Sequence, residues 1–534
     1  MVDMTREIER KYEAAGTTKA GGLPDLTGVD AVAGVTDRGV VTLDAVYYDT
    51  PCRRLAADGI TLRRRTGGGD EGWHLKLPVG ADTRDEIRAP LSDTLPDRLA
   101  ALVRSRVRAT ELVPLVHLLS ERDVKHLVDA DGALLAEISA DRVTARRLAP
   151  ETGEPVRWTE YEVELAEGRD PALLDALEPR LTEAGLRRSA APSKLARALA
   201  ETDPARSGKT SPKSAKSPKS AKSAKGKGKK ADKAAKKDAK ALAGDVVLAY
   251  VRRQITAIVT LDPAVRLDTY DSVHRMRVAT RRLRSAFRSY RKVLDRTVTD
   301  PIGAELKWLA AELGIDRDRE VLTARLEERL GEVPVELRLG PVAARLRIWS
   351  EARRQGSRGR LIEVLDGERY LALLDRLDAL LAAPPLRPAA ARPAEDVILK
   401  AVLRDYGRVA DRVETALHMP AGPERDLTLH DARKGAKRAR YAAEAARPAL
   451  GRPAKRFAKR MAAVQGLLGD HQDSVVAREA LRELAIQSHA AGESAFVYGL
   501  LYGREEALAA ARERELPELW AEVSRPAHRA ALRR

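Results

Sequence analysis

Cysteine, aromatic residues and long apolar runs are all scarce in this sequence. The single cysteine, Cys52, excludes an intrachain disulfide framework. The first residues, MVDMTREIERKY, lack the apolar core of a signal peptide, and no apolar run is long enough to cross a bilayer. We therefore expect a soluble protein of the reducing cytoplasm with no membrane partner. Aromatic residues are only 4% of the 534 residues, which disfavours a surface that stacks nucleic-acid bases.

The positive charge of the chain is concentrated in one segment. The net charge is +17, from 96 Lys and Arg against 79 Asp and Glu. Residues 207–240 hold 13 Lys and two Asp, so this segment alone carries most of the excess. Its composition of Lys, Ser and Ala cannot bury a core. We predict a disordered linker over residues 203–242, and the linker prompts nucleic-acid binding as a weaker alternative.

Residues 1–202 contain short segments in which polar and apolar residues alternate. A period of two predicts antiparallel strands. Helices are expected near residues 95–104 and 171–184. The alternating segments are Thr5–Tyr12, Ala45–Asp49, Ile60–Arg65, Trp73–Leu77, Leu134–Val143 and Trp158–Leu165.

Residues 243–534 have the pattern of long helices, with breaks near residues 383–393 and 419–423. This region also repeats internally. VHRMRVATRRLRSAF at 273–287 aligns with LHDARKGAKRARYAA at 429–443, and LGIDRDREV at 313–321 aligns with LGDHQDSVV at 468–476. The offsets are 156 and 155 residues, which predicts an all-helical domain of two related bundles.

Charged residues recur two positions apart in the predicted strands, so each set shares one face of its strand. A half-exposed sheet would place such faces in solvent. A closed barrel would instead turn them inward to line a tunnel, where acidic rows hold Mg²⁺ or Mn²⁺ and basic rows bind phosphate. The sets are Glu7, Glu9 and Lys11; Glu160, Glu162 and Glu164; Arg63 and Arg65; Arg84 and Glu86; and Glu137 and Asp141, with Lys76 in WHLKL.

The N-terminal region resembles the CYTH, or triphosphate tunnel metalloenzyme, family. The motifs EIERKY, YYDTPCRRLAADGITLRRRTGGGDEGWHLKLP, EVEL and APSKLARAL follow one another in the order of that family. The resemblance implies an eight-stranded antiparallel β-barrel tunnel with flanking helices, which hydrolyses or cyclises triphosphates with a divalent metal.

Site residues follow from this resemblance by motif. Catalysis would involve Glu7, Glu9 and Lys11. The metal, Mg²⁺ or Mn²⁺, would be held by Glu7, Glu9, Glu137, Asp141, Glu160, Glu162 and Glu164. The triphosphate would be bound by Arg63, Arg65, Lys76, Arg84, Arg122 and Lys194.

Two helical segments of the C-terminal region carry basic stripes. The arginines of a single Arg-rich helix usually lie on its solvent-exposed face. Both repeats, however, keep one His and four basic residues in register, and uncompensated like charges on one stripe destabilise a helix. Their presence in both repeats indicates an anionic partner.

The region resembles the CHAD domain, on the segments VHRMRVATRRLR, LHDARKGAKRARY and LGDHQDSVV. The resemblance implies two pseudo-symmetric helical bundles that bind inorganic polyphosphate. The candidate polyphosphate-binding residues are His274, Arg277, Arg281, Arg282, Arg284, Arg288, His430, Arg433, Lys434, Lys437, Arg438, Arg440, Lys455 and Lys459.

We expect a metal-dependent triphosphatase domain over residues 1–202 and a polyphosphate-binding domain over residues 243–534. The expected reaction is hydrolysis of inorganic triphosphate or short polyphosphate. A non-catalytic polyphosphate-binding protein at polyphosphate granules is one alternative. Thiamine triphosphate or a nucleotide as the substrate is another.

Overall fold

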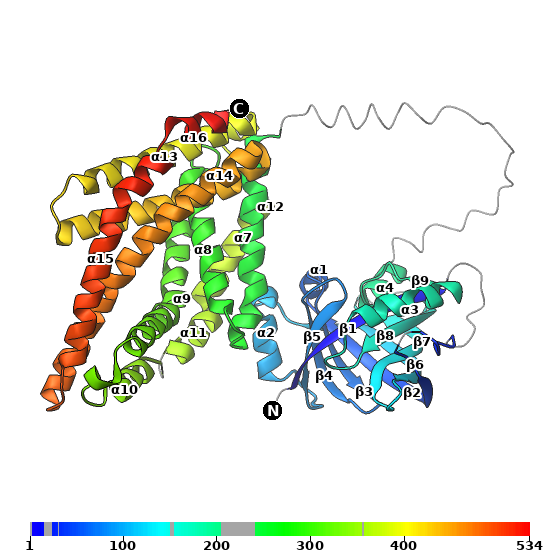
Figure 1. Cartoon of the computed structure of the whole chain (residues 1–534). Helices are drawn as coiled ribbons and strands as arrows, with labels where there is room; N and C mark the ends of the chain where they lie inside the picture. Colours follow the sequence, from blue (N-terminus) through cyan, green and yellow to red (C-terminus); the bar gives the residue numbers. More distant parts are fainter. Residues whose placement is uncertain are drawn as a thin grey trace. The chain divides into compact units, whose positions relative to one another are not determined.

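The computed structural model describes residues 3–14, 24–29, 31–149, 154–203, 241–354 and 357–533. These residues form two compact units, one rich in strands and one helical (Figure 1). The predicted linker over 203–242 lies almost entirely outside the described residues, and its disorder stays a prediction.

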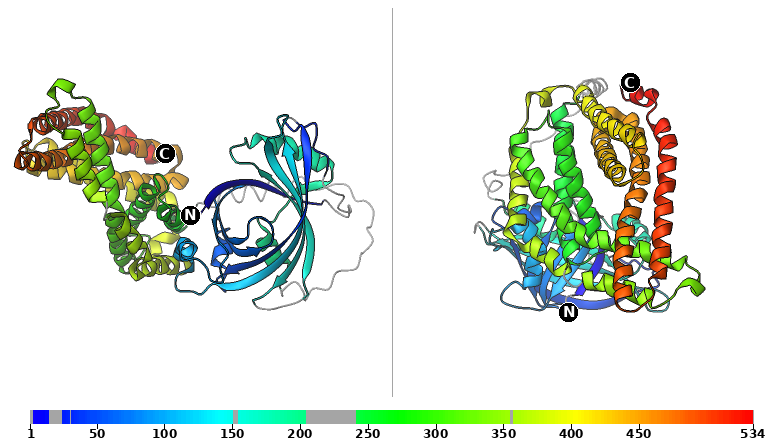
Figure 2. Two further views of the ribbon diagram at one scale, coloured as in Figure 1. Left: turned by 90° about the horizontal axis from the view of Figure 1, so that it is seen from below. Right: turned by 90° about the vertical axis from the view of Figure 1, so that its left-hand side faces the viewer.

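The N-terminal unit is a closed antiparallel barrel of eight strands. The strands follow the order β5-β4-β3-β2-β6-β7-β8-β1, and β1 pairs with β5 to close the ring. A ninth strand, β9 (Leu186–Arg188), pairs with the end of β1. Figure 2 shows the strands curving round the barrel axis. The eight strands are β1 (Asp3–Ala14), β2 (Gly34–Asp49), β3 (Thr61–Thr66), β4 (Gly72–Pro78), β5 (Thr83–Ala89), β6 (Val113–Val128), β7 (Leu134–Arg147) and β8 (Val156–Leu165).

The helices of this unit are α1 (Arg54–Ala57), α2 (Asp97–Val107), α3 (Ala172–Glu183) and α4 (Lys194–Glu201). Helix α3 covers part of the outer face of the barrel, whereas α4 packs against inward-facing residues such as Tyr47 and Trp158. The buried leucines of α3 pack against Tyr12 of β1 and Tyr161 and Val163 of β8. These three alternate with the charged residues of their strands, so the apolar face turns outward and the charged face inward. Burying each large apolar side chain contributes about 1.5–3 kcal/mol, which favours this orientation of the strands.

The C-terminal unit is helical. Two short 3₁₀ turns, η1 (Val335–Leu337) and η2 (Pro388–Ala391), separate some of its helices, and η3 (Ala531–Arg533) follows the last. The helices are α7 (Ala243–Arg266), α8 (Ser272–Ser289), α9 (Arg296–Gly331), α10 (Val342–Arg354), α11 (Ser357–Asp366), α12 (Glu368–Ala382), α13 (Ala394–Leu417), α14 (Pro423–Ala490), α15 (Phe496–Val523) and α16 (Pro526–Ala530). Helix α14 kinks at Gly451, whose φ of 60° and ψ of −137° are not helical. The predicted fold class, a barrel followed by an all-helical domain, is thereby confirmed.

The two aligned repeats lie on helices that pack side by side. Residues 273–287 fall in α8 and residues 429–443 in the first part of α14, and these helices are in contact. Helix α14 buries a row of alanines with no exposed surface, and small side chains allow close helix approach. This close packing also keeps the neighbouring basic side chains half-buried. The row is Ala432, Ala436, Ala439, Ala443 and Ala446.

We expect residues 1–203 to fold without the helical unit, because the barrel has its own core. Circular dichroism should show one cooperative thermal transition for this fragment. A fragment that ends at Leu165 is the comparison; it lacks α3, β9 and α4, and it exposes Tyr161 and Val163, which α3 covers. Equal stability of the two fragments would contradict the stabilising role of α3.

Candidate functional site

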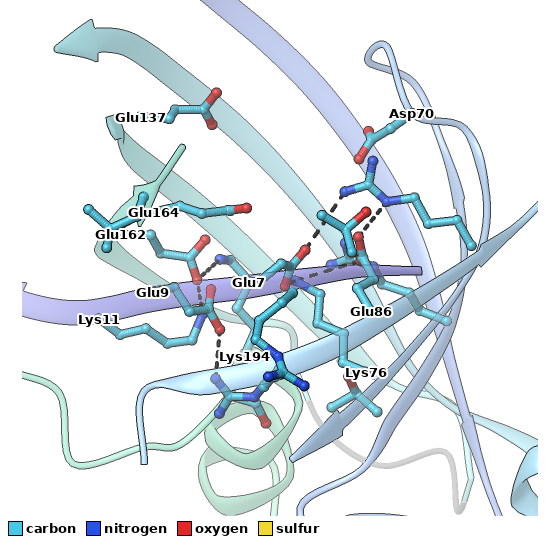
Figure 3. Close-up of a pocket in the computed structure, with 18 of the residues that line it drawn as sticks. Glu7, Glu9, Lys11, Asp70, Lys76, Glu86, Glu137, Glu162, Glu164 and Lys194 are labelled. Atoms are coloured by element: carbon cyan, nitrogen blue, oxygen red, sulfur yellow. Dashed lines mark hydrogen bonds and ion pairs between the residues drawn. The ribbon is translucent and has the colours of Figure 1, made fainter. Parts of the chain in front are cut away.

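A charged cavity lies inside the barrel, and all eight strands contribute to its wall. Its volume is ≈310 Å³. Figure 3 shows carboxylates and basic groups pointing into the same space. The charged residues of the wall are Arg6, Glu7, Glu9, Lys11, Arg63, Arg65, Asp70, Lys76, Arg84, Glu86, Arg88, Arg122, Glu137, Glu162, Glu164, Glu167 and Lys194.

The structure brings together the tunnel residues that the sequence predicted. All of them line the cavity except Asp141 and Glu160. Those two lie next to it, where their carboxylates contact the ammonium of Lys194 at 2.9 and 3.0 Å. Every predicted position is therefore at the cavity or one contact from it.

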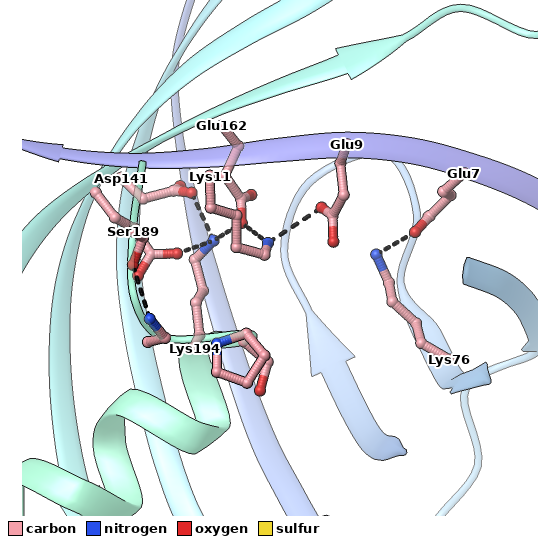
Figure 4. A network of polar contacts seen from close by, with 12 residues as sticks. Glu7, Glu9, Lys11, Lys76, Asp141, Glu162, Ser189 and Lys194 are labelled. Atoms are coloured by element: carbon pink, nitrogen blue, oxygen red, sulfur yellow. Dashed lines mark hydrogen bonds and ion pairs between the residues drawn. The ribbon is translucent and has the colours of Figure 1, made fainter. Parts of the chain in front are cut away.

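Strand register places the acidic rows opposite each other. Glu9 on β1 pairs in register with Glu164 on β8, and Lys11 pairs with Glu162. The ammonium of Lys11 lies 3.1 Å from Glu9 and contacts Glu162 as well (Figure 4). Two rows of carboxylates thus share one wall, with a lysine between them.

Glu7 and Glu9 have opposite electrostatic environments. Burial raises the pKa of Glu7 to about 8, with Glu164 and Glu86 adding to the effect, although Lys76 lies only 2.5 Å away. Burial also acts to raise the pKa of Glu9, but Lys11, Lys76 and Arg84 outweigh it and lower the pKa to about 2. A cation bound beside Glu7 would offset this cost of burying its charged carboxylate and would lower its pKa.

A second group of carboxylates lies at the α4 end of the cavity. One oxygen from each of Asp141, Glu160 and Glu162 falls within 4.8 Å of the others. The ammonium of Lys194 lies among them, 2.7 Å from Glu162. These oxygen donors match the preference of Mg²⁺ and Mn²⁺, and Lys194 supplies the compensating charge in this structure.

The basic residues of the tunnel are already paired with carboxylates. Arg122 donates to Asp141 at 2.8 and 2.9 Å and to Glu162 at 2.7 Å. Arg84 donates to Glu9 at 2.8 Å, and Arg65 contacts Asp70. An anion that enters this cavity must therefore compete with the carboxylates, and a cation that binds the carboxylates would free the basic groups.

Sequence reasoning left three buried polar residues out of the candidate site. Glu86, 1% exposed, accepts from Arg88 and lies 2.9 Å from His74. The hydroxyl of Tyr47 accepts a hydrogen bond from Arg63 at 3.3 Å. Strand alternation contained the signal for Glu86 and His74, which lie two residues from Arg84 and Lys76.

No strand periodicity predicts Asp70, which lies in the β3–β4 turn. The turn depends on Gly67, whose φ is 79° and where a Cβ would lie 2.3 Å from the carbonyl oxygen of Thr42. The turn brings the Asp70 carbonyl within 2.9 Å of His74. Its contribution to the wall is decided by the turn conformation and not by residue spacing.

The predicted arginines and lysines of the helical unit separate into three groups, apart from the exposed Lys434. A central group lies on the facing sides of α8 and α14. It consists of Arg277, Arg281, Arg433 and Lys437. Burial lowers the pKa of both Arg281 and Lys437, and the charges of Arg277 and Arg433 lower these two pKa values further.

The second group lines a cavity of ≈560 Å³, which we call the Arg288 pocket. Its predicted members are Arg284, Arg288 and Arg438, and sequence reasoning missed the rest of its basic wall. The missed residues are Arg291, Arg296, Lys307, Arg408 and Arg412. They come from α9, α13 and the residues after α8, which the repeat alignment does not cover.

The third group lines a cavity of ≈680 Å³, which we call the Glu444 pocket. It contains Arg282, Arg440, Lys455 and Lys459 of the predicted set.

The expectation that the basic stripes lack partners is wrong for several members. Arg277 donates to Asp318 at 2.7 and 2.8 Å. Asp318 and Asp473 lie next to these stripes because α9 and the later turns of α14 pack beside them, which the stripe pattern does not reveal. Asp431 and Glu444 instead lie one helical turn from Lys434 and Arg440. The other pairs are Arg282 and Arg440 with Glu444, Arg433 with Asp473, and Lys434 with Asp431.

The two predicted histidines differ from the arginines in their surroundings. His430 lies at the start of α14 with its Nδ1 buried and without a hydrogen-bond partner. Burial and then the charge of Lys434 lower its pKa. His274 is exposed at the start of α8. Neither histidine lines the Arg288 pocket or the Glu444 pocket.

Comparison with known proteins assigns each unit to a domain family. The CYTH domain model matches residues 5–199, and the CHAD domain model matches residues 249–482. An uncharacterized protein of Mycobacterium tuberculosis, Rv2226, is 37% identical over 519 residues, covering 94% of this chain and 93% of that protein. Within the described residues, no helix is long and apolar enough to cross a membrane.

Solved structures resemble each unit separately. The CHAD domain from the plant Ricinus communis is 26% identical and covers 54% of this chain and 93% of that one, with a TM-score of 0.44. A Hippeastrum protein with a dominant triphosphatase activity is 17% identical and covers 37% of this chain and 96% of that one, with a TM-score of 0.24.

Proposed function

Because the chain belongs to the CYTH–CHAD family, we propose that its barrel hydrolyses inorganic triphosphate or short polyphosphate and that its helical unit binds long polyphosphate. CYTH domains are those of the triphosphate tunnel metalloenzymes, and CHAD domains point to polyphosphate binding. The observation that carries the proposal for this chain is the tunnel itself. Rows of carboxylates and rows of basic groups face one closed cavity.

The carboxylates of the tunnel fit a divalent cation. Glu7, Glu9, Glu162 and Glu164 offer oxygen donors, and burial, with smaller effects from Glu164 and Glu86, raises the pKa of Glu7. Mg²⁺ or Mn²⁺ bound there would neutralise charge on the phosphate oxygens and help to orient the substrate.

The basic groups of the tunnel would bind and orient the phosphates. Arg63 and Arg122 have planar guanidinium groups that can form paired hydrogen bonds with phosphate oxygens. Lys76 and Lys194 lie next to the acidic rows, where they would hold phosphate oxygens close to the metal ligands. Fixing the chain in one extended geometry lowers the entropic part of the barrier.

The lining of the tunnel favours an inorganic substrate over a nucleotide. Of the described residues in the wall, only Tyr47 is aromatic, and its hydroxyl already accepts from Arg63. A nucleobase would find no stacking surface of the kind that base-binding sites use.

A phosphate-release panel tests the proposed reaction. Triphosphate, longer polyphosphate, ATP and thiamine triphosphate are compared with Mg²⁺ or Mn²⁺ and with a chelator. We expect turnover of triphosphate that requires metal and exceeds the turnover of ATP. A preference for ATP or thiamine triphosphate would replace the proposed substrate, and no turnover of any of them would remove the enzymatic proposal.

Polyphosphate binding by the helical unit is expected to weaken as the pH rises above about 7. Burial, and then the charges of Arg281, Arg433 and Arg277, lower the pKa of Lys437 to about 7. A bound polyanion favours the charged ammonium, so binding above pH 7 takes up a proton. One unit of pKa shift corresponds to about tenfold in affinity.

Titrations at pH 6.5 and 8.5 measure this effect, with K437Q as the test variant. K437Q should bind more weakly at pH 6.5 and lose most of the difference between the two pH values. K400Q on α13 is the matched control, because Lys400 is exposed and lines neither the Arg288 pocket nor the Glu444 pocket. An unchanged pH dependence in K437Q would show that another group titrates.

A further inference from the structure

The internal repeat relates the two basic pockets to each other. At the offset of 156 residues, Arg284 corresponds to Arg440 and Arg282 corresponds to Arg438. Arg284 and Arg438 line the Arg288 pocket, whereas Arg440 and Arg282 line the Glu444 pocket. Each pocket therefore contains one arginine from each of the two repeat positions. The position that α8 supplies to one pocket is supplied by α14 to the other.

One repeat position changes the sign of its charge between the two pockets. Extending the same alignment by one residue past 287 makes Glu444 the counterpart of Arg288. Both residues line their pockets. The exchange replaces a positive charge by a negative one at equivalent places.

Glu444 pairs with two of the six basic residues that line its pocket. Its carboxylate accepts from Arg440 at 2.9 Å and lies 3.0 Å from Arg282. The same two guanidinium groups lie at 5.7 and 5.4 Å from the centre of the Tyr441 ring. The Glu444 carboxylate therefore occupies hydrogen-bonding positions of both guanidinium groups.

The corresponding arginines of the Arg288 pocket have no such partner. In the part of the chain that the structure describes, no carboxylate forms an ion pair with Arg284, Arg288 or Arg438. The acidic residue in the wall, Asp300, pairs with Arg296 at 2.7 Å. Like charges crowd this pocket, and burial together with Arg288 and Arg438 lowers the pKa of Arg284.

We propose that the two repeats bind polyphosphate unequally, with the Arg288 pocket as the primary site and the Glu444 pocket held closed to phosphate by Glu444 as a built-in anion. This inference rests on the proposed polyphosphate binding and adds an order of occupation to it. A short chain fills the Arg288 pocket alone. A long chain gains the contacts with Arg282 and Arg440 only by displacing Glu444, so the second pocket selects for length.

Substitutions at the two equivalent positions test the proposal. R288Q should lower the affinity for both triphosphate and long polyphosphate about tenfold, as expected for one charge-assisted hydrogen bond. E444Q should leave the first binding event unchanged, add a second equivalent of bound triphosphate and raise the affinity for long chains. R275Q on α8 and E479Q on α14 are the matched controls, since both residues are exposed and line neither pocket.

All variants are made in the full-length chain carrying E7Q and E9Q and are titrated calorimetrically without divalent metal, so that the tunnel contributes equally to each. Thermal unfolding checks that they fold. Equal losses from R288Q and E444Q, or no change in stoichiometry with E444Q, would overturn the unequal-site proposal. If the parent chain itself binds no polyphosphate, the proposed function fails instead, which keeps the two results distinct.

Discussion

Replacing Glu7 and Glu9 together by Gln should reduce metal-dependent triphosphate hydrolysis at least about a thousandfold, because charge stabilisation of phosphoryl transfer depends on the cation that these residues would hold. Both side chains are buried in the tunnel wall, with exposures of 3% and 5%. Gln keeps their size and hydrogen-bonding capacity but cannot provide the anionic oxygens that a divalent cation binds. Steady-state phosphate release over a range of Mg²⁺ and Mn²⁺ concentrations measures the effect.

A matched control distinguishes loss of the proposed metal site from loss of a negative charge outside the tunnel. Glu121 on β6 is exposed and pairs with Arg142, outside the cavity, so E121Q should retain full activity. Thermal unfolding should show that the double variant remains folded. Wild-type activity in folded E7Q/E9Q protein would show that the metal assignment is wrong.

The second large effect is expected for polyphosphate affinity when Arg284, Arg288 and Arg438 are replaced together by Gln. Each forms part of the wall of the Arg288 pocket. Loss of three charge-assisted contacts, at about 1.5 kcal/mol or more each, predicts a loss of affinity of at least about a hundredfold even if the effects do not add fully. Arg277 is left intact because Asp318 already neutralises it.

Salt dependence gives this prediction a second readout. Phosphate contacts release condensed counterions, so wild-type affinity should fall steeply with salt and the triple variant should show a shallower slope. The control is a triple variant at exposed arginines outside the pockets, Arg275, Arg482 and Arg514. An unchanged affinity in the pocket variant would mean that the chosen face does not bind the polymer.

Single-stranded DNA of matched length, titrated at the same salt, distinguishes the remaining alternative. The Arg288 pocket contains Phe287 as its one aromatic residue among those described, and base stacking needs exposed aromatic faces. We expect weaker binding to DNA than to polyphosphate. Equal or tighter binding to DNA would favour a nucleic-acid partner.

The barrel was largely predictable because alternation is a local property. The apolar Tyr161 and Val163 between the glutamates of β8 predict which face turns outward, and the structure buries both. The acidic rows and the helices near residues 95–104 and 171–184 followed from the same kind of pattern. Glu86 was equally accessible to this reasoning, since it shares a face with Arg84.

The helical unit was predictable in class but not in its electrostatics. The repeat identified α8 and the start of α14 as related, and helical spacing placed their arginines on one stripe. The stripe gave no information about Asp318 and Asp473, which come from turns distant in sequence and neutralise Arg277 and Arg433.

Local patterning therefore determines the strands, the helices, the repeat and the types of residue that face one another in this protein. The tertiary structure alone decides the long-range pairs: Lys194 with Asp141, Glu160 and Glu162, and Glu444 with Arg282. The physical reason is distance. Periodicity reflects neighbours within one element, whereas charge compensation depends on strand register, barrel closure and helix packing between residues far apart along the chain.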